Sequence, residues 1–278
     1  MKTILNISHY SINVFGLFIA IGIIVGYLIT MKEAKRKEFS TDTISDLIFY
    51  VIIFGIIGAR LYYVLVFNLD YYLNNPNKII AIWDGGLSIQ GALIGGGIAA
   101  LVYSRRKEIN LWRAADIMGP GTILGQAIGR VGCDVFGIAM KNKYFWGVLR
   151  GSELLHPAQM YESVLNYILF GILWARRKSV KYDGQLFFTY LIGFSINRFI
   201  VEFFRANPIF IKPLTVAHAT SVILIIISII ALRILKKKGN NSDNINETRI
   251  FSINVGEIAI ILSMIIVSLF LYYNWIWR

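Results

Sequence analysis

Residues 12–37, INVFGLFIAIGIIVGYLITMKEAKRK, decide the class of structure that this chain adopts. Positions 12–31 carry no charged residue, and a helix needs about 20 consecutive apolar residues to cross the hydrocarbon core of a bilayer. Lys32, Lys35, Arg36 and Lys37 follow directly. An uncharged span that ends in a basic cluster is typical of a transmembrane helix whose basic end lies in the cytoplasm.

The pattern of apolar spans recurs along the chain, whose 278 residues are 56% hydrophobic and only 16% charged. This composition predicts an all-α fold, a polytopic integral membrane helix bundle. The predicted spans are residues 12–31, 44–67, 80–104, 114–133, 158–175, 184–204, 215–235 and 251–274. We expect a seven-span core within residues 1–236, a polar cytoplasmic linker over residues 237–250, and an additional C-terminal transmembrane helix within residues 251–278.

The placement of the basic residues explains the formal net charge of +12. Basic clusters follow every second predicted span, and the intervening connections carry only scattered lysines. This alternation places both chain ends outside the cell and makes the lipid bilayer the expected partner. A nucleic acid partner is not expected, because no contiguous basic and aromatic surface is evident. The clusters are Lys32 to Lys37, Arg105 to Lys107, Arg176 to Lys178, and Lys236 to Lys238.

Cysteine and histidine are too few and too scattered for a metal site. The single Cys133 excludes an internal disulfide and any metal cluster built from cysteines. The three histidines, His9, His156 and His218, lie on different segments without the spacing of metal ligands. No metal is therefore expected.

Four arginines lie inside or at the ends of the predicted spans: Arg60, Arg130, Arg198 and Arg205. An ionised side chain in a hydrocarbon span is expensive and usually faces a protein interior, a polar cavity or a partner. The expected topology directs all four toward the outer membrane face. Their convergence suggests a pocket for an anion that is itself embedded in the bilayer.

The sequence from Arg198 to Arg205 reads RFIVEFFR. Offsets of four and seven residues place Arg198, Glu202 and Arg205 on one face of a helix. Such a ladder can be purely structural, because each buried charge needs a partner to offset its desolvation. Spacing alone leaves the structural and the functional interpretation open.

The sequence from Gly125 to Gly132 reads GQAIGRVG and contains the second of these arginines, Arg130. Flanking glycines, among them Gly129 and Gly132, leave its guanidinium free of neighbouring bulk, and the planar fork suits a phosphate. The alternative is an arginine that extends to the membrane interface, which would not need flanking glycines.

Two further segments place polar groups near the outer ends of spans. The first, His156 to Glu162, reads HPAQMYE and adds Gln159 and Tyr161 to a helix start, with His156 as a titratable candidate for acid–base work. Its alternative is an ordinary helix entrance with an interfacial tyrosine. The other segment contains Gln90, and a lone glutamine in a span more often bonds a neighbouring helix.

These segments, in this order, resemble the prolipoprotein diacylglyceryl transferase family. The resemblance runs from about Phe15 to Pro208, and the ordered set of motifs is highly specific. The matching stretches are Gly58 through Asn68, Trp83 to Gly95, Ala115-Asp116, Gly125 to Gly132, His156 to Glu162, and Arg198 to Arg205.

The resemblance implies a bacterial transferase of the cytoplasmic (inner) membrane whose active site lies toward the outer face. The family moves a diacylglyceryl group from phosphatidylglycerol to the lipobox cysteine in the signal peptide of a prolipoprotein and uses no cofactor. Two alternatives stay open. One is a divergent paralogue that binds phosphatidylglycerol but has another acceptor or is inactive, and the other is a secondary transporter of an anion.

The resemblance also implies roles for individual residues. Arg130 matches the signature arginine and is expected to bind the lipid headgroup, with Arg198, Arg205 and Arg60. The expected catalytic residues are Arg130, Arg198, Glu202, His156 and Gln90, supported by Gln159, Tyr161, Glu162, Gly129 and Gly132.

The chain departs from the family pattern at the group that removes the thiol proton. Many members have histidine where this chain has Gln90, and a neutral amide cannot act as a base. The segment after Gly132 also differs. His156, Glu202 and Asp134 remain candidates for the base, in that order.

Overall fold

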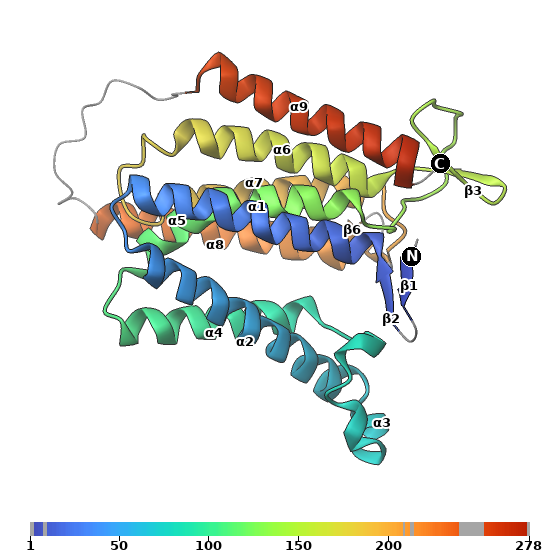
Figure 1. Ribbon diagram of the computed structural model, residues 1–278, viewed down its shortest axis with the longest axis horizontal. Helices are drawn as coiled ribbons and strands as arrows, with labels where there is room; N and C mark the ends of the chain where they lie inside the picture. Colours follow the sequence, from blue (N-terminus) through green and yellow to red (C-terminus); the bar gives the residue numbers. More distant parts are fainter. Residues whose placement is uncertain (1–2, 8–9, 208, 212–213, 239–252, 277–278) are drawn as a thin grey trace. The chain divides into compact units, whose positions relative to one another are not determined.

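The structure, a computed structural model, describes residues 3–7, 10–207, 209–211, 214–238 and 253–276 (Figure 1). Most of this described part is helical. In chain order the helices are α1 (Val14–Arg36), α2 (Thr41–Phe67), α3 (Leu69–Asn74), α4 (Ile89–Arg106), α5 (Leu111–Val131), α6 (Ala158–Arg176), α7 (Gln185–Glu202), α8 (Val216–Lys238) and α9 (Val255–Leu271). The π-helical turn Tyr272–Ile276 continues α9, and 3-10 turns occupy Pro76–Lys78 and Ile82–Asp84.

Among the described residues, three antiparallel hairpins, which the prediction of an all-helical fold did not include, accompany the helices. Their strands are β1 (Thr3–Ile7) with β2 (Tyr10–Asn13), β3 (Val148–Arg150) with β4 (Glu153–Leu155), and β5 (Ile209–Ile211) with β6 (Leu214–Thr215). Each hairpin lies at an end of a long helix. The fold is therefore helical in its long segments and uses extended backbone in its connections.

Within the described part of the chain, four helical segments are long and apolar enough to cross a membrane. They are Val14–Arg36, Thr41–Phe67, Val216–Lys237 and Val255–Ile276. Each of the eight predicted spans contains a long helix, but the full eight-span arrangement with a seven-span core stays a prediction. The predicted linker falls largely on residues 239–250, which lie outside the described residues.

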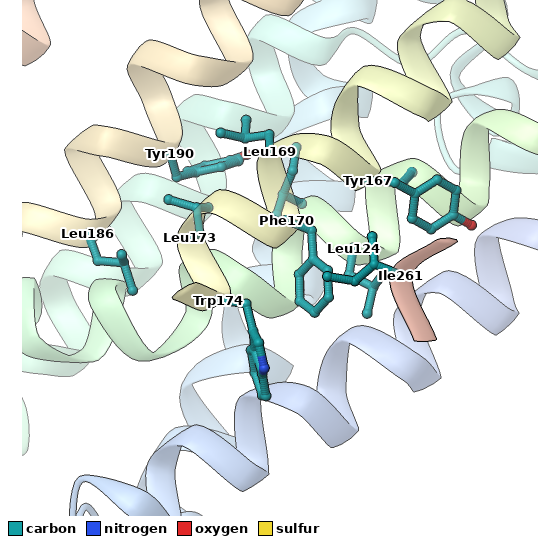
Figure 2. Packing of buried hydrophobic residues seen from close by; sticks show 11 residues of the cluster. Leu124, Tyr167, Leu169, Phe170, Leu173, Trp174, Leu186, Tyr190 and Ile261 are labelled. Atoms are coloured by element: carbon teal, nitrogen blue, oxygen red, sulfur yellow. The ribbon is translucent and has the colours of Figure 1, made fainter. Parts of the chain in front are cut away.

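The chain divides into two compact units, one of residues 1–30 with 115–278 and the other of residues 31–114. In the larger unit α6 is the central helix, and its buried side chains meet α5, α7 and α9 (Figure 2). Burial of large apolar and aromatic side chains is the dominant favourable term in holding such elements together. The cluster includes Leu124, Tyr167, Leu169, Phe170, Leu173, Trp174, Leu186, Tyr190 and Ile261.

Glycines let α1 and α5 of the larger unit approach at backbone distance. A Cβ atom added to Gly22 would lie 2.5 Å from the carbonyl oxygen of Gly125, and one added to Gly26 would lie 2.6 Å from that of Gly121. The four-residue spacing of Gly121 and Gly125 predicts a face that another backbone can approach. The structure confirms this prediction and identifies α1 as the partner.

The smaller unit consists mainly of α2 packed along α4. Here Arg60 of α2 binds the loop that precedes α4. Its five N–H groups donate to five backbone carbonyls, those of Lys78, Ile79, Ala81, Gly85 and Gly86, and its side chain is only 5% exposed. The guanidinium thus supplies hydrogen-bond donors to carbonyls that lie outside any α-helix.

The predicted start of the third span at residue 80 is wrong, because α4 begins at Ile89. Gly85 and Gly86 have φ values of 85° and 73°, in the left-handed region that a right-handed helix cannot use. Their carbonyls accept from Arg60 instead of from the next helical turn. Residues before Ile89 therefore form a loop held by Arg60.

The approach of α1 to α5 yields a test with a matched control on one helix. Gly22→Ala should lower the thermal stability of the detergent-solubilised protein, because the added methyl group lacks room and overpacking costs roughly 1–3 kcal/mol. Gly16→Ala should leave stability equal or slightly higher, since nothing lies within 4 Å of its added Cβ. Size-exclusion chromatography after heating measures both. Equal losses would contradict the close packing of these helices.

Candidate functional site

Three short backbone segments join the ends of α5, α6 and α7. The Gly137 N–H donates to the His156 carbonyl at 2.8 Å, and the His156 N–H donates to the Ile138 carbonyl at 3.0 Å. The Ile138 N–H in turn donates to the Phe204 carbonyl at 2.9 Å. The segment after α5, the segment before α6 and the segment after α7 are thereby tied side by side. This junction brings charged residues from three helix ends together.

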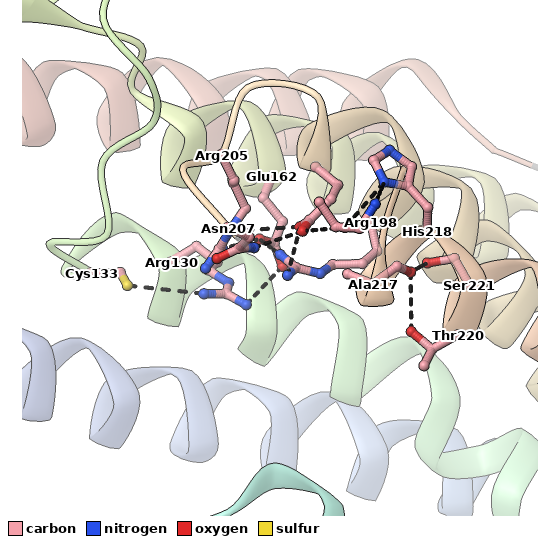
Figure 3. Close-up of polar contacts among 12 residues, drawn as sticks. Arg130, Cys133, Glu162, Arg198, Arg205, Asn207, Ala217, His218, Thr220 and Ser221 are labelled. Atoms are coloured by element: carbon pink, nitrogen blue, oxygen red, sulfur yellow. Dashed lines mark hydrogen bonds and ion pairs between the residues drawn. The ribbon is translucent and has the colours of Figure 1, made fainter. Parts of the chain in front are cut away.

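Glu162, in the first turns of α6, is the centre of the charged cluster (Figure 3). Its Oε1 lies 2.9 Å from Nη2 of Arg130. Its Oε2 lies 3.8 Å from Nη1 of Arg198 and 3.9 Å from Nη1 of Arg205. One carboxylate, 1% exposed, therefore faces three guanidinium groups from two other segments.

Glu202, at the end of α7, is a second carboxylate with an equally dense set of partners. Its Oε2 lies 2.8 Å from Nη2 of Arg198 and 3.8 Å from Nε of Arg205. Its Oε1 accepts hydrogen bonds from Asn207 Nδ2 at 2.6 Å and from Thr215 Oγ1 at 2.8 Å. Both arginines of the predicted ladder therefore lie beside Glu202. The prediction that all three share one helix face is wrong for Arg205, because α7 ends at Glu202.

Burial and charge are distributed unevenly in this cluster. The carboxylate side chains are at most 1% exposed, whereas those of Arg130, Arg198 and Arg205 are 29%, 22% and 13% exposed. Burial, together with the positive charges of Arg198 and Arg130, lowers the pKa of Arg205. Three cations on two buried anions leave one net positive charge at the more exposed side of the cluster. An incoming anion would complete the charge balance.

Two guanidinium nitrogens of the cluster have no hydrogen-bond acceptor in the described structure. Among the described residues, Arg198 Nη1 and Arg205 Nε are buried and make no hydrogen bond, although both lie within 4 Å of a carboxylate oxygen. A guanidinium fork suits the oxygens of a phosphate group, which it can bind through two parallel bonds. The three arginine side chains, which are partly exposed, are therefore suited to bind a phosphate group.

Asn207, Thr215 and His218 belong to the surroundings of Glu202, and the sequence analysis missed all three as site residues. Thr215 precedes α8, and its N–H and hydroxyl both lie 3.1 Å from Nδ1 of the buried His218. A threonine directly before an apolar run is a helix-start signal, which could have identified this position. The spacing of Asn207 from Glu202 offers no comparable signal.

His156 contacts aromatic groups of the junction. Its Nδ1 lies 3.1 Å from the Tyr161 hydroxyl, and its ring packs 5.1 Å from the Phe204 ring between centroids. The Trp146 indole donates to the same Tyr161 hydroxyl at 3.0 Å. Burial lowers the pKa of His156, so its imidazole is neutral at pH 7. The described residues thus place an uncharged histidine on the backbone junction that holds the arginine cluster.

The remaining predicted site residues have other surroundings. Gln90 is exposed in the first turn of α4, in the smaller unit, and its Oε1 accepts from Ser88 Oγ at 2.7 Å. Cys133 is buried, with its Sγ 3.9 Å from Nη1 of Arg130.

Glycines flank Arg130 for different reasons. A Cβ on Gly132 would lie 2.8 Å from Phe18, so this position allows close packing of α1. A Cβ on Gly129 would meet only Ile19, at an ordinary 3.8 Å. Close packing therefore explains Gly132 but not Gly129.

The fold and the charged cluster together define a helical membrane protein with a cationic site suited to a phosphate group. The chain belongs to the prolipoprotein diacylglyceryl transferase family, whose model matches residues 2–234.

Curated relatives carry the name phosphatidylglycerol–prolipoprotein diacylglyceryl transferase. One from Clostridioides difficile is 40% identical over 235 residues, covering 84% of this chain and 94% of the relative. One from Halalkalibacterium halodurans is 34% identical over 240 residues, covering 81% and 83%. One from Bacillus cereus is 33% identical over 260 residues, covering 88% and 96%.

The shared carboxylate predicts a stability change that an anion can reverse. Glu162→Gln should destabilise the protein by roughly 2–4 kcal/mol, because three guanidinium groups lose their common counter-charge. Glycerol phosphate should restore the melting temperature of this variant more than it raises that of the unchanged protein. Glu153→Gln, at the exposed first position of β4, is the control. If the two variants melt alike, Glu162 does not hold the cluster together.

Proposed function

We propose that this chain transfers the diacylglyceryl group of phosphatidylglycerol to the lipobox cysteine thiol of bacterial prolipoproteins, the first step of lipoprotein maturation. Family membership and the names of the relatives support the reaction. The observation that carries the proposal is the set of three arginines on two buried carboxylates at the ends of α5, α6 and α7. We place the reaction at the outer face of the cytoplasmic membrane, as the distribution of basic residues suggests.

The reaction exchanges one bond to the glyceryl carbon for another. The cysteine thiolate attacks the carbon that carries the phosphate, a carbon–sulfur bond forms, and the carbon–oxygen bond to the phosphate breaks. Glycerol phosphate leaves with the bonding electron pair, and the thiol proton passes to a base. Because negative charge accumulates on the departing phosphate, fixed guanidinium groups stabilise the transition state more than the bound lipid.

The geometry suggests how the cluster divides this work. Arg130 is the most exposed of the three arginines and pairs closely with one carboxylate oxygen, so it suits the headgroup phosphate. Arg198 and Arg205 add positive charge beside it. Glu162 and Glu202 are buried and hold the three guanidinium groups against their mutual repulsion. The carboxylates therefore orient the arginines, and the arginines meet the lipid.

Arg60 and Gln90 take different places in this proposal from those that the resemblance implies. All five N–H groups of Arg60 are engaged by backbone carbonyls, so we assign it to holding the loop before α4. Gln90 lacks a titratable group and lies exposed at the start of α4, where it can contribute a hydrogen bond but not remove a proton.

Of the three candidates for the base, the surroundings favour His156. Glu202 is buried and its oxygens already face four donor groups, so they are less accessible to a substrate thiol than the half-buried imidazole of His156. His156 is neutral at pH 7 and can accept a proton. Asp134 follows the arginine segment in the sequence, and we assign it no role.

The role of Arg130 has a sharp test. Arg130→Ala should lower transfer from labelled phosphatidylglycerol to a lipobox peptide by about 10²-fold or more, as when a main stabilising donor is removed from an active site. Arg113→Ala, at the exposed opposite end of α5, should retain activity. Both the released glycerol phosphate and the labelled peptide are measured. A fully active Arg130→Ala variant would remove the main site assignment.

The same assay separates the transferase from a divergent paralogue. Release of glycerol phosphate without labelling of the peptide would indicate another acceptor. Expression in cells depleted of their own enzyme should also restore lipidated precursor.

The pH dependence of transfer follows from the pKa of His156. Because burial lowers this pKa, the base stays neutral as the pH falls through the ordinary histidine range near about 6.5. The rate should therefore fall only below that range, where protonation removes the base. His156→Gln should give a low rate without this acidic limb. An unchanged profile in that variant would exclude His156 as the base.

A further inference from the structure

The C-terminal helix α9 lies beyond the residues that match the family model, which end at 234. It nevertheless packs along α6, the helix that carries Glu162, and polar contacts join the two along their length. Glu257 accepts from Trp174 Nε1 at 2.7 Å near one end. The Tyr167 hydroxyl lies 2.9 Å from Ser268 Oγ in the middle.

At the other end of α9, its π-helical turn reaches the first turn of α6. The Tyr272 hydroxyl accepts from Gln159 Nε2 at 2.7 Å, and both residues are buried. Tyr272 and Ile276 belong to a core cluster with Met160, which stands between Gln159 and Tyr161. Departures from regular α-helix are frequent at functional sites. The turn therefore packs directly against residues that adjoin the charged cluster.

A chain of hydrogen bonds leads from this turn to His156. The Tyr273 hydroxyl donates to the backbone carbonyl of Trp146 at 2.7 Å. The Trp146 indole donates to the Tyr161 hydroxyl at 3.0 Å, and that hydroxyl lies 3.1 Å from Nδ1 of His156. Each step joins a different segment of the chain.

The chemistry of the donors sets the direction of the bonds from Tyr273 to Trp146 and from Trp146 to Tyr161. An indole N–H can only donate, so the Tyr161 oxygen accepts from Trp146. In the described structure the acceptor within reach of the Tyr161 proton is Nδ1 of His156. With Tyr161 assigned as the donor in this contact, neutral His156 carries its own proton on Nε2, and Nδ1 is the nitrogen that can gain a proton.

We propose that α9 is part of the catalytic unit and that Tyr273, acting through Trp146 and Tyr161, is a positioning residue that holds His156 in one orientation and one tautomer. Tyr272 supports the same turn of α6 through Gln159. That this positioning of His156 serves catalysis rests on the proposed transfer reaction. The positioning itself is a property of the folded chain and can be measured without any substrate.

If α9 only stabilised α6, the substitutions that remove its hydroxyl contacts would have different effects. In that case every hydroxyl that joins α9 to α6 would matter in the same way, through stability alone. Tyr167 provides the comparison, because its hydroxyl joins α6 to Ser268 of α9 but belongs to no chain that reaches His156. Tyr167 lies six residues beyond Tyr161, roughly 9 Å along the helix axis.

The experiment compares Tyr273→Phe, Tyr272→Phe and Tyr167→Phe, each of which removes one hydroxyl and keeps the ring. The full-length protein contains three histidines, so ¹⁵N-histidine labelling in detergent micelles gives few imidazole signals, and His156→Ala identifies the relevant ones. The nitrogen shifts at pH 8 report the tautomer of neutral His156. Transfer from labelled phosphatidylglycerol to a lipobox peptide gives kcat and KM.

Tyr273→Phe should convert the single Nε2–H tautomer into a mixture and lower kcat about five- to tenfold, while the KM for phosphatidylglycerol stays unchanged because the arginines are untouched. Tyr272→Phe should act in the same direction. Tyr167→Phe should leave the tautomer and kcat as they are. If Tyr273→Phe keeps the tautomer, or Tyr167→Phe changes it equally, the proposal is wrong. A changed tautomer in a protein without transfer activity would instead refute the proposed function and leave the positioning intact.

Discussion

The arrangement of the larger unit depends on the pairing of two carboxylates that have almost no contact with solvent. Glu162 and Glu202 lie at most 1% exposed, on two different helices, and an unpaired charge in such a place would cost several kcal/mol. Each is paired by more than one arginine, and Arg198 and Arg205 each lie within 4 Å of both carboxylates. The helix ends must therefore stay together, and the backbone junction of the segments at Gly137, His156 and Phe204 provides the means. The contacts that hold the three helix ends together are thus the same contacts that set the position of the charged cluster.

Arginine serves two distinct purposes in the two units of this chain. Arg60 binds five carbonyl oxygens, which are neutral acceptors, and its donors are all engaged in holding a loop. Arg130, Arg198 and Arg205 face ionised carboxylates and remain partly exposed, with an excess of positive charge. The difference lies in the partner and not in the residue, because a guanidinium saturated by backbone oxygens has no N–H group left for a ligand.

The polar residues of α6 also follow from its central place in the larger unit. Ser163 donates to the Ala127 carbonyl of α5 at 2.8 Å, and Asn166 accepts from Asn197 of α7 at 3.1 Å. Away from water, each such group needs a partner, so the polar positions of α6 specify which helices surround it. The apolar cluster around Phe170 and Trp174 supplies the attraction, and the hydrogen bonds select the arrangement.

Sequence by itself determined the class of the protein, the positions of its long helices, and the pairing of Arg198 with Glu202, because these depend on hydropathy and helical period within one segment. The glycine spacing of α5 also predicted a close backbone contact, though not its partner. Tertiary structure alone decided that Glu162 is the common counter-charge of three arginines, that Arg60 is occupied by a loop, and that α9 reaches the surroundings of His156. These features depend on contacts between segments that are far apart in the sequence. Such contacts produce no periodic pattern in the residues around either partner.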